Sequence, residues 1–101
     1  MSAAPPREAL VLVVDDDAGS RKAMALTLAT DGRRVEEFPD ADAALARAVE
    51  GPSVGLVVTD LKMPGKTGIE LATELAAARP DVSVLLVTAF GDIDTLLKAK
   101  D

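Results

Sequence analysis

The sequence contains no cysteine and no histidine among its 101 residues. Their absence excludes disulfide bonds, thiol nucleophiles, imidazole bases and zinc sites built from these ligands. A chain without cysteine also fits a reducing compartment, so we expect a cytoplasmic protein. Any chemistry must therefore use carboxylates, hydroxyl groups, basic side chains or the backbone.

Aromatic residues, long apolar runs and positive charge are also scarce. The two aromatic residues are both Phe, so the core must be built from aliphatic side chains. The longest apolar run, residues 9–14, is too short to span a bilayer, and the N-terminus does not resemble a signal peptide. A net charge of -6 opposes direct binding to nucleic acid or to an anionic membrane. We expect a protein that binds neither directly.

Apolar segments alternate with segments of helical periodicity along the chain. The expected strands are residues 9–14, 34–38, 54–59 and 82–87, and the expected helices are residues 20–30, 40–50, 69–79 and a last one from about residue 92. This alternation predicts an α/β fold, in which helices cover both faces of a doubly wound parallel sheet. Residues 1–8, with two prolines, are expected to form a flexible leader.

Acidic residues follow two of the expected strands. Asp15, Asp16 and Asp17 come after the first strand, and Asp60 comes after the third. The carboxyl ends of parallel strands share one edge, where ligands bind. Two carboxylates about 5 Å apart repel each other by about 3 kcal/mol at an effective dielectric near 20, so the group needs a cation. Its oxygen ligands predict Mg²⁺, which leaves Asp60 able to act as a nucleophile toward a phosphoryl group, with the Thr88 hydroxyl placed to bind it.

Three segments together resemble the receiver domain of two-component response regulators. They are VLVVDDD at residues 11–17, DLKMPGKTGIEL at residues 60–71 and VLLVTAFGD at residues 84–92. The resemblance implies a flavodoxin-like fold with strand order 2-1-3-4. It also implies that residues 9–101 are a truncated receiver domain, in which the fifth strand and the last helix of the family are missing.

The resemblance assigns a role to each matching residue. It implies that Asp60 is the phosphoacceptor, which takes its phosphoryl group from a sensor histidine kinase, and that Thr88 is the switch hydroxyl. It implies a Mg²⁺ site made by Asp15, Asp16, Asp60 and the backbone carbonyl of Lys62. The TAFGD segment is similar to receivers that regulate transcription, which implies an output domain outside this sequence. Such a domain is regulatory, with no enzyme activity beyond its own dephosphorylation.

Two other functions stay open. The lysine that follows the fifth strand of the family is absent, which permits a non-phosphorylated pseudo-receiver that acts as a dimerisation module. Without a fifth strand, residues 82–87 are an exposed apolar edge, which predicts a homodimer or a domain-swapped association through that edge. The last alternative is a phosphohydrolase, because an apolar strand that ends in D-x-D resembles the haloacid dehalogenase pattern, with Asp15 as nucleophile and Asp17 as acid/base. That reading leaves the segment from Asp60 to Gly68 unexplained.

Overall fold

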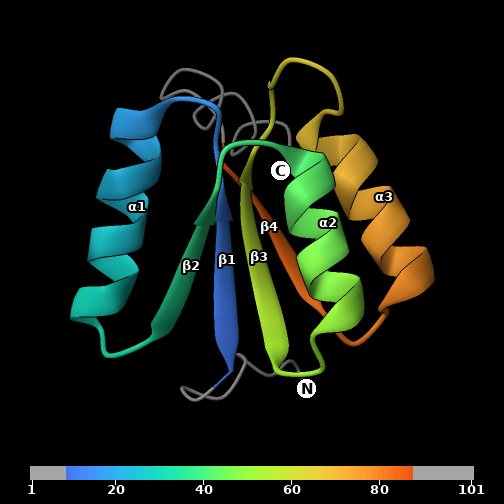
Figure 1. Cartoon of the computed structure of the whole chain (residues 1–101), viewed down its shortest axis with the longest axis horizontal. Helices are drawn as coiled ribbons and strands as arrows, with labels where there is room; N and C mark the ends of the chain where they lie inside the picture. The colour runs from blue at the N-terminus through green and yellow to red at the C-terminus, as the bar shows by residue number, and fades with distance from the viewer. Residues whose placement is uncertain (1–8, 88–101) are drawn as a thin grey trace, which may run out of the picture.

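The computed structural model describes residues 9–87, which form a parallel sheet between two helical layers (Figure 1). The elements in chain order are β1 (Leu10–Val14), α1 (Ala18–Thr30), β2 (Arg34–Phe38), α2 (Ala41–Glu50), β3 (Val54–Asp60), α3 (Gly68–Ala78) and β4 (Ser83–Val87). All neighbouring strands are parallel, in the order β2-β1-β3-β4. In Figure 1, α1 lies on one side of the sheet, and α2 and α3 lie on the other. The predicted doubly wound, flavodoxin-like fold and its strand order are confirmed.

Several sequence predictions fall outside residues 9–87. They concern the leader at residues 1–8, Thr88, and the helix expected from about residue 92. Within the described residues, α1 begins at Ala18, two positions before the predicted start. The same part of the chain contains no helix that is both long and apolar enough to cross a membrane.

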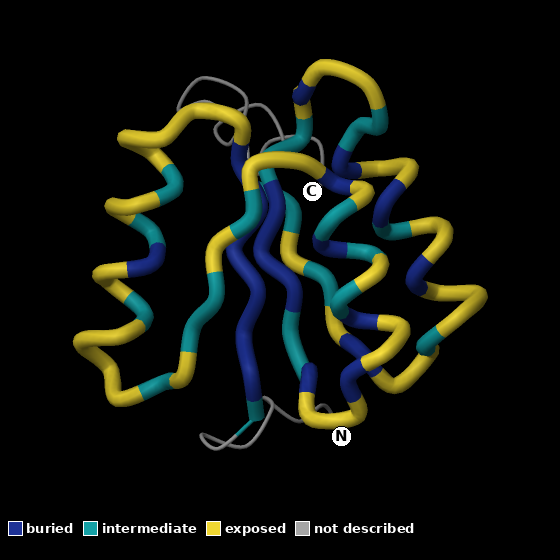
Figure 2. Tube along the Cα trace, in the orientation of Figure 1, coloured by how far each residue is buried: buried dark blue, intermediate teal, exposed yellow. Residues whose placement is uncertain are grey.

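Strand β1 lies in the middle of the sheet, and all five of its residues are buried. This placement explains its uninterrupted apolar sequence, because a central parallel strand is covered on both faces. In contrast β2, with the sequence RVEEF, lies at an edge and is buried only in part. Figure 2 shows that the centre of the sheet is buried, whereas the outer faces of the helices are exposed.

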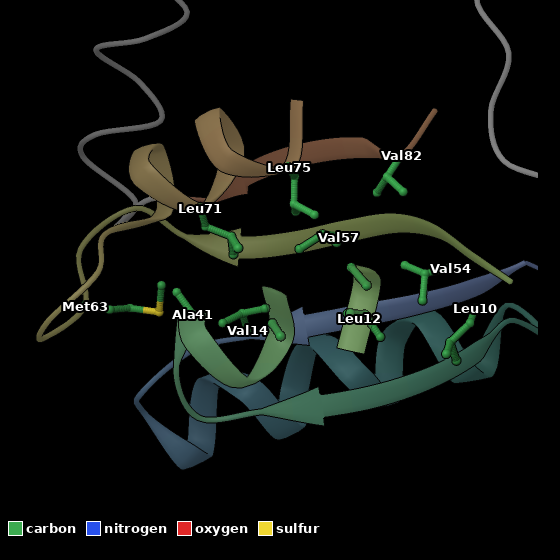
Figure 3. Packing of buried hydrophobic residues seen from close by; sticks show 12 residues of the cluster. Leu10, Leu12, Val14, Ala41, Val54, Val57, Met63, Leu71, Leu75 and Val82 are labelled. Atoms are coloured by element: carbon green, nitrogen blue, oxygen red, sulfur yellow. The ribbon is translucent and has the colours of Figure 1, made fainter. Parts of the chain in front are cut away.

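The main core fills the space between the sheet and the pair α2 and α3 (Figure 3). Small side chains, Ala41, Ala44 and Ala48, form the buried face of α2, whereas α3 contributes Leu71 and Leu75. Burying a leucine side chain stabilises the fold by about 1.5–3 kcal/mol. The alanines bring α2 close to the sheet, so the strand ends and the loops that follow them are held at fixed positions.

Each helix begins with a side chain that binds a free backbone amide. Asp17 accepts from Ser20 N at 2.8 Å at the start of α1, and Asp40 accepts from Ala43 N at 2.8 Å at the start of α2. Helix α3 starts with a capping box, in which Thr67 and Glu70 bind each other's backbone amides. A cap of this kind contributes about 1 kcal/mol and sets the residue at which a helix starts.

Candidate metal centre

The register of the sheet brings two acidic segments together at the carboxyl ends of the strands. Val14, the last residue of β1, is paired with Thr59 of β3, so Asp15 and Asp60 follow at the same level on adjacent strands. One carboxylate oxygen from each of Asp15, Asp16 and Asp60 lies within 4.8 Å of the other two. The structure thus gathers three of the predicted metal ligands at one point.

Hydrogen bonds fix Asp15 at this point. Its backbone N–H donates to Phe38 O at 3.1 Å, and its carbonyl oxygen accepts from Arg21 Nη1 at 2.8 Å. Its Oδ1 accepts from the Asp17 amide at 2.9 Å. Only 5% of the residue is exposed, so the carboxylate has little freedom to turn away from the cluster.

The environment of Asp15 disfavours its negative charge. Burial raises the pKa of Asp15, the hydrogen bond from the Asp17 amide lowers it, and the negative charges of Asp60, Asp16 and Asp17 raise it further, with a net upward shift. A cation bound to these oxygens would reverse the balance, because it favours the ionised form of every carboxylate around it.

The backbone after Asp60 turns sharply into a loop and then into α3. A Cβ atom at Gly68 would collide with the carbonyl oxygen of Asp60, so only glycine fits where α3 starts. Gly65 has a φ of 78°, in the left-handed region that glycine adopts readily. The Leu61 amide donates to Val87 O, and the Gly68 amide donates to Leu61 O, each at 3.0 Å. Asp60 is therefore held between β4 and the start of α3.

Two side chains hold the β3–α3 loop to the rest of the molecule. Met63 is buried in the main core and points toward Ala41 of α2 in Figure 3. Lys66 Nζ lies 2.7 Å from Glu74 Oε2 and 3.2 Å from Asp42 Oδ1, which links the loop to α3 and α2. The sequence gives no periodic signal for the Lys66 contacts, because the loop, α2 and α3 meet only in the folded chain.

A cavity of about 430 Å³ opens beside the acidic cluster. Its lining combines the acidic residues with the start of α1 and the end of β4: Asp15, Asp17, Ser20, Ala23, Met24, Asp60 and Val87. A second, apolar cavity of about 360 Å³ shares Ala23, Met24 and Val87 with it. The acidic cluster therefore faces an open space that a small ligand can enter.

The other two predicted site residues, Lys62 and Thr88, do not belong to the carboxylate cluster. Lys62 is exposed in the β3–α3 loop, two residues after Asp60. Thr88 lies outside the described residues, but Val87 before it is paired with Asp60 in the sheet. Roles for the Lys62 carbonyl and the Thr88 hydroxyl stay predictions.

The donor set fits a hard divalent cation. Three carboxylates supply oxygen ligands only, and the chain has no cysteine or histidine to add softer donors. Mg²⁺ binds through one or two carboxylates and keeps several waters, whereas structural zinc sites use sulfur and nitrogen ligands. The cluster thus offers a metal ion three oxygen ligands.

Comparison with known proteins identifies similar sequences over almost the whole chain. A family model, "Response regulator receiver domain", matches residues 11–101. The C4-dicarboxylate transport transcriptional regulatory protein DctD of Rhizobium meliloti is 40% identical over 98% of this chain and 20% of its own length. The transcriptional regulatory protein FixJ of Bradyrhizobium diazoefficiens is 38% identical over 88% of this chain and 43% of its own length. The chain thus spans less than half the length of either relative.

Solved structures share the same fold. One is the response regulator protein TrrA from Thermotoga maritima in complex with Mg²⁺-BeF, with a TM-score of 0.78 and 29% identity over 86% of this chain and 75% of that one. Another is the histidine kinase ThkA in complex with TrrA, with a TM-score of 0.74 and 30% identity over 81% of this chain and 70% of the matched one.

Proposed function

Because this chain belongs to the response regulator receiver domain family, we propose that Asp60 accepts a phosphoryl group from a sensor histidine kinase. The observation that carries the proposal is the carboxylate cluster, in which oxygens of Asp15, Asp16 and Asp60 lie within 4.8 Å of one another beside an open cavity. A signalling domain of this kind is regulatory and is not a metabolic enzyme.

The cofactor proposed for this site is Mg²⁺. Asp15, Asp16, Asp60 and the backbone carbonyl of Lys62 would hold it. When bound, the ion supplies positive charge that offsets the negative oxygens of an incoming phosphoryl group. The likeness to TrrA, solved with Mg²⁺-BeF, supports this choice of ion.

The reacting group in the proposed transfer is the Asp60 carboxylate. One of its oxygens attacks the phosphorus of a phosphohistidine, so that a P–O bond forms while the P–N bond breaks and its electron pair remains on the imidazole nitrogen. Asp60 lies at the end of β3, and the loop after it is held by Gly68 and by the buried Met63. Such fixed placement favours in-line attack, because the nucleophile does not have to be reoriented. Thr88 is proposed to donate a hydrogen bond to the transferred group.

The proposed phosphodonor is a histidine kinase, and the proposed output is transcriptional. The similarity to a structure that contains both ThkA and TrrA supports the first proposal. DctD and FixJ, both described as transcriptional regulatory proteins, support the second. The output domain would lie outside the sequence considered, since the match covers a minor part of each relative.

Two contacts support the proposal that Asp60, and not Asp15, is the nucleophile. The Asp15 carboxylate is buried and accepts a hydrogen bond from the Asp17 amide, while the Asp17 carboxylate caps α1. A phosphohydrolase would need Asp15 free to attack and Asp17 free to transfer a proton. One Asp15 oxygen is already bound by the Asp17 amide, and the Asp17 carboxylate is already engaged as the cap of α1.

Phosphorylation with a small-molecule donor tests the proposal. The protein is incubated with Mg²⁺ and acetyl phosphate, and the modified residue is mapped by mass spectrometry in the wild type, Asp60→Asn and Asp15→Asn. Label on Asp60 that disappears in Asp60→Asn supports the proposal. Label on Asp15 would identify a phosphohydrolase instead, and no label in the wild type would leave the pseudo-receiver, a docking or dimerisation module, as the function.

A further inference from the structure

We propose that Arg21 is a positioning residue for the metal centre, which holds the peptide group between Asp15 and Asp16 in the orientation that cation binding requires. The proposal rests on the function proposed above for these two carboxylates. It assigns a role to a basic residue that does not itself touch the metal.

The Arg21 side chain joins three elements. Its Nη1 donates to the carbonyl oxygen of Asp15 at 2.8 Å, and its Nε donates to Glu37 Oε1 at 3.3 Å. The side chain is only 17% exposed, although it extends from the first turns of α1. Arg21 therefore links α1 to β2 and to the segment that follows β1.

The atom that Arg21 binds is important because a peptide group is planar. The carbonyl of Asp15 and the amide of Asp16 belong to one rigid unit. If this unit rotates, the Asp16 carboxylate changes direction relative to Asp15. The Asp15 amide donates to Phe38 O, and Asp15 Oδ1 accepts from the Asp17 amide. The carbonyl is the other backbone group of Asp15, and Arg21 is the residue that holds it.

Glu37 keeps the guanidinium in place. It lies on β2, paired with Val13 of β1, so it is fixed by the sheet close to the end of β1. With Nε bound to Glu37, the planar guanidinium presents Nη1 to the Asp15 carbonyl at a defined angle. Outer-shell groups that orient metal ligands in this way commonly contribute about 10-fold to 100-fold to metal affinity.

Charge and positioning make opposite predictions for the loss of Arg21. If Arg21 acts only through its positive charge, its removal strengthens Mg²⁺ binding, because a cation near the site repels another. If Arg21 orients the ligands, its removal weakens Mg²⁺ binding despite the more favourable charge. The sign of the change therefore separates the two roles.

The next residue on α1 is a matched control. Lys22 carries the same charge, and its Nζ lies 3.9 Å from the same Glu37 oxygen. Its side chain is 75% exposed, and among residues 9–87 it pairs with Glu37 alone. Lys22→Met removes one positive charge from the same region and leaves the Asp15 carbonyl bound.

The experiment measures Mg²⁺ affinity by isothermal titration calorimetry in the wild type, Arg21→Met, Arg21→Lys and Lys22→Met. We expect Arg21→Met to weaken binding about tenfold, Arg21→Lys to recover part of the loss, and Lys22→Met to bind as the wild type or slightly more tightly. Urea unfolding in EDTA shows that each variant is folded under the titration conditions. A purely structural role would alter unfolding and leave the affinity of the folded protein unchanged.

Binding by Arg21→Met that equals or exceeds that of the wild type would overturn the proposal. If Arg21→Met does not fold, the Arg21→Lys variant decides. Lysine is shorter and offers a single-point donor, so positioning predicts that this variant binds Mg²⁺ more weakly than the wild type. Equal affinity would refute positioning. A wild type that binds no Mg²⁺ would instead refute the metal site itself, and the role of Arg21 with it.

Discussion

Val14 and Thr59 are paired in register on adjacent parallel strands, and the residues that follow them, Asp15 and Asp60, both belong to the carboxylate cluster. The cluster is thus a consequence of sheet register. A shift of one residue between β1 and β3 would move one carboxylate to the opposite face of the sheet.

Mutation of Asp60 should raise stability without Mg²⁺ and reduce the gain in stability that Mg²⁺ provides. In EDTA, Asp60→Asn removes one of the mutually repelling charges near Asp15 and Asp16, so the urea midpoint should rise. In saturating Mg²⁺ the wild type gains stability from binding, and the variant should gain less. Urea titrations in the two buffers measure both changes. A variant less stable than the wild type in EDTA would show that repulsion is not important in the cluster.

The start of α3 should not tolerate a side chain at Gly68. Gly68→Ala places a methyl group against the Asp60 carbonyl, and we expect a loss of about 1–3 kcal/mol in the free energy of unfolding. Gly19→Ala on α1 is the control, since its Cβ would meet only Asp17 Oδ2 at 3.5 Å. That substitution should stabilise the helix by about 0.5–1 kcal/mol. Equal effects of the two substitutions in urea unfolding would contradict the role of Gly68.

Arg79 should be important for the stability of the α2–β3 connection. Its Nη1 donates to Ala48 O at 2.7 Å and to Gly51 O at 2.9 Å, and its side chain is 16% exposed. Arg79→Met leaves these carbonyl oxygens without their charged donor, so we expect a clear decrease in the free energy of unfolding. Urea unfolding measures the change, with Arg47→Met as a comparison. The ion pair between Arg47 and Glu36 joins two partly exposed side chains. Arg47→Met should therefore lower the free energy of unfolding less than Arg79→Met does.

Acid should weaken the same region through Asp81. The hydrogen bond from Arg79 holds the pKa of Asp81 below its ordinary value. A group whose pKa is lowered by folding stabilises the folded state above its unfolded pKa, and this contribution is lost as the pH falls through the folded pKa. Asp81→Asn should therefore reduce stability at neutral pH. Below about pH 4 the stability of this variant should fall less steeply with decreasing pH than that of the wild type. Thermal unfolding from pH 7 to pH 3 measures this difference, and parallel curves for the two proteins would exclude the contribution.

The parts of the fold and site that the sequence predicted correctly are those with a local signal. The apolar run that forms β1 and the helical periodicity of α2 identified their elements, and the acidic residues after β1 and β3 marked the edge where they meet. The predicted start of α1 at residue 20 is two residues too late, because the Asp17 carboxylate accepts from Ser20 N and caps a helix that begins at Ala18.

Contacts between distant elements were not predictable in the same way. Arg79 binds the carbonyl oxygen of Ala48, 31 residues earlier in the chain, and Lys66 of the β3–α3 loop reaches Asp42 on α2. These side chains are long and charged, so their sequence positions are compatible with full exposure to solvent. Only the packing of α2 and α3 brings their partners within reach.

Met63 has a consequence for the motion of the β3–α3 loop. Met63 is 7% exposed and belongs to the same buried cluster as Ala41 and Leu71. The loop cannot swing away from Asp60 unless this thioether leaves the interior, so its opening amounts to local unfolding. Amide hydrogens near Met63 should accordingly exchange with deuterium more slowly than those of an ordinary surface loop. Any rearrangement that does extract Met63 would leave a void beside Ala41, and so would be transmitted directly to α2.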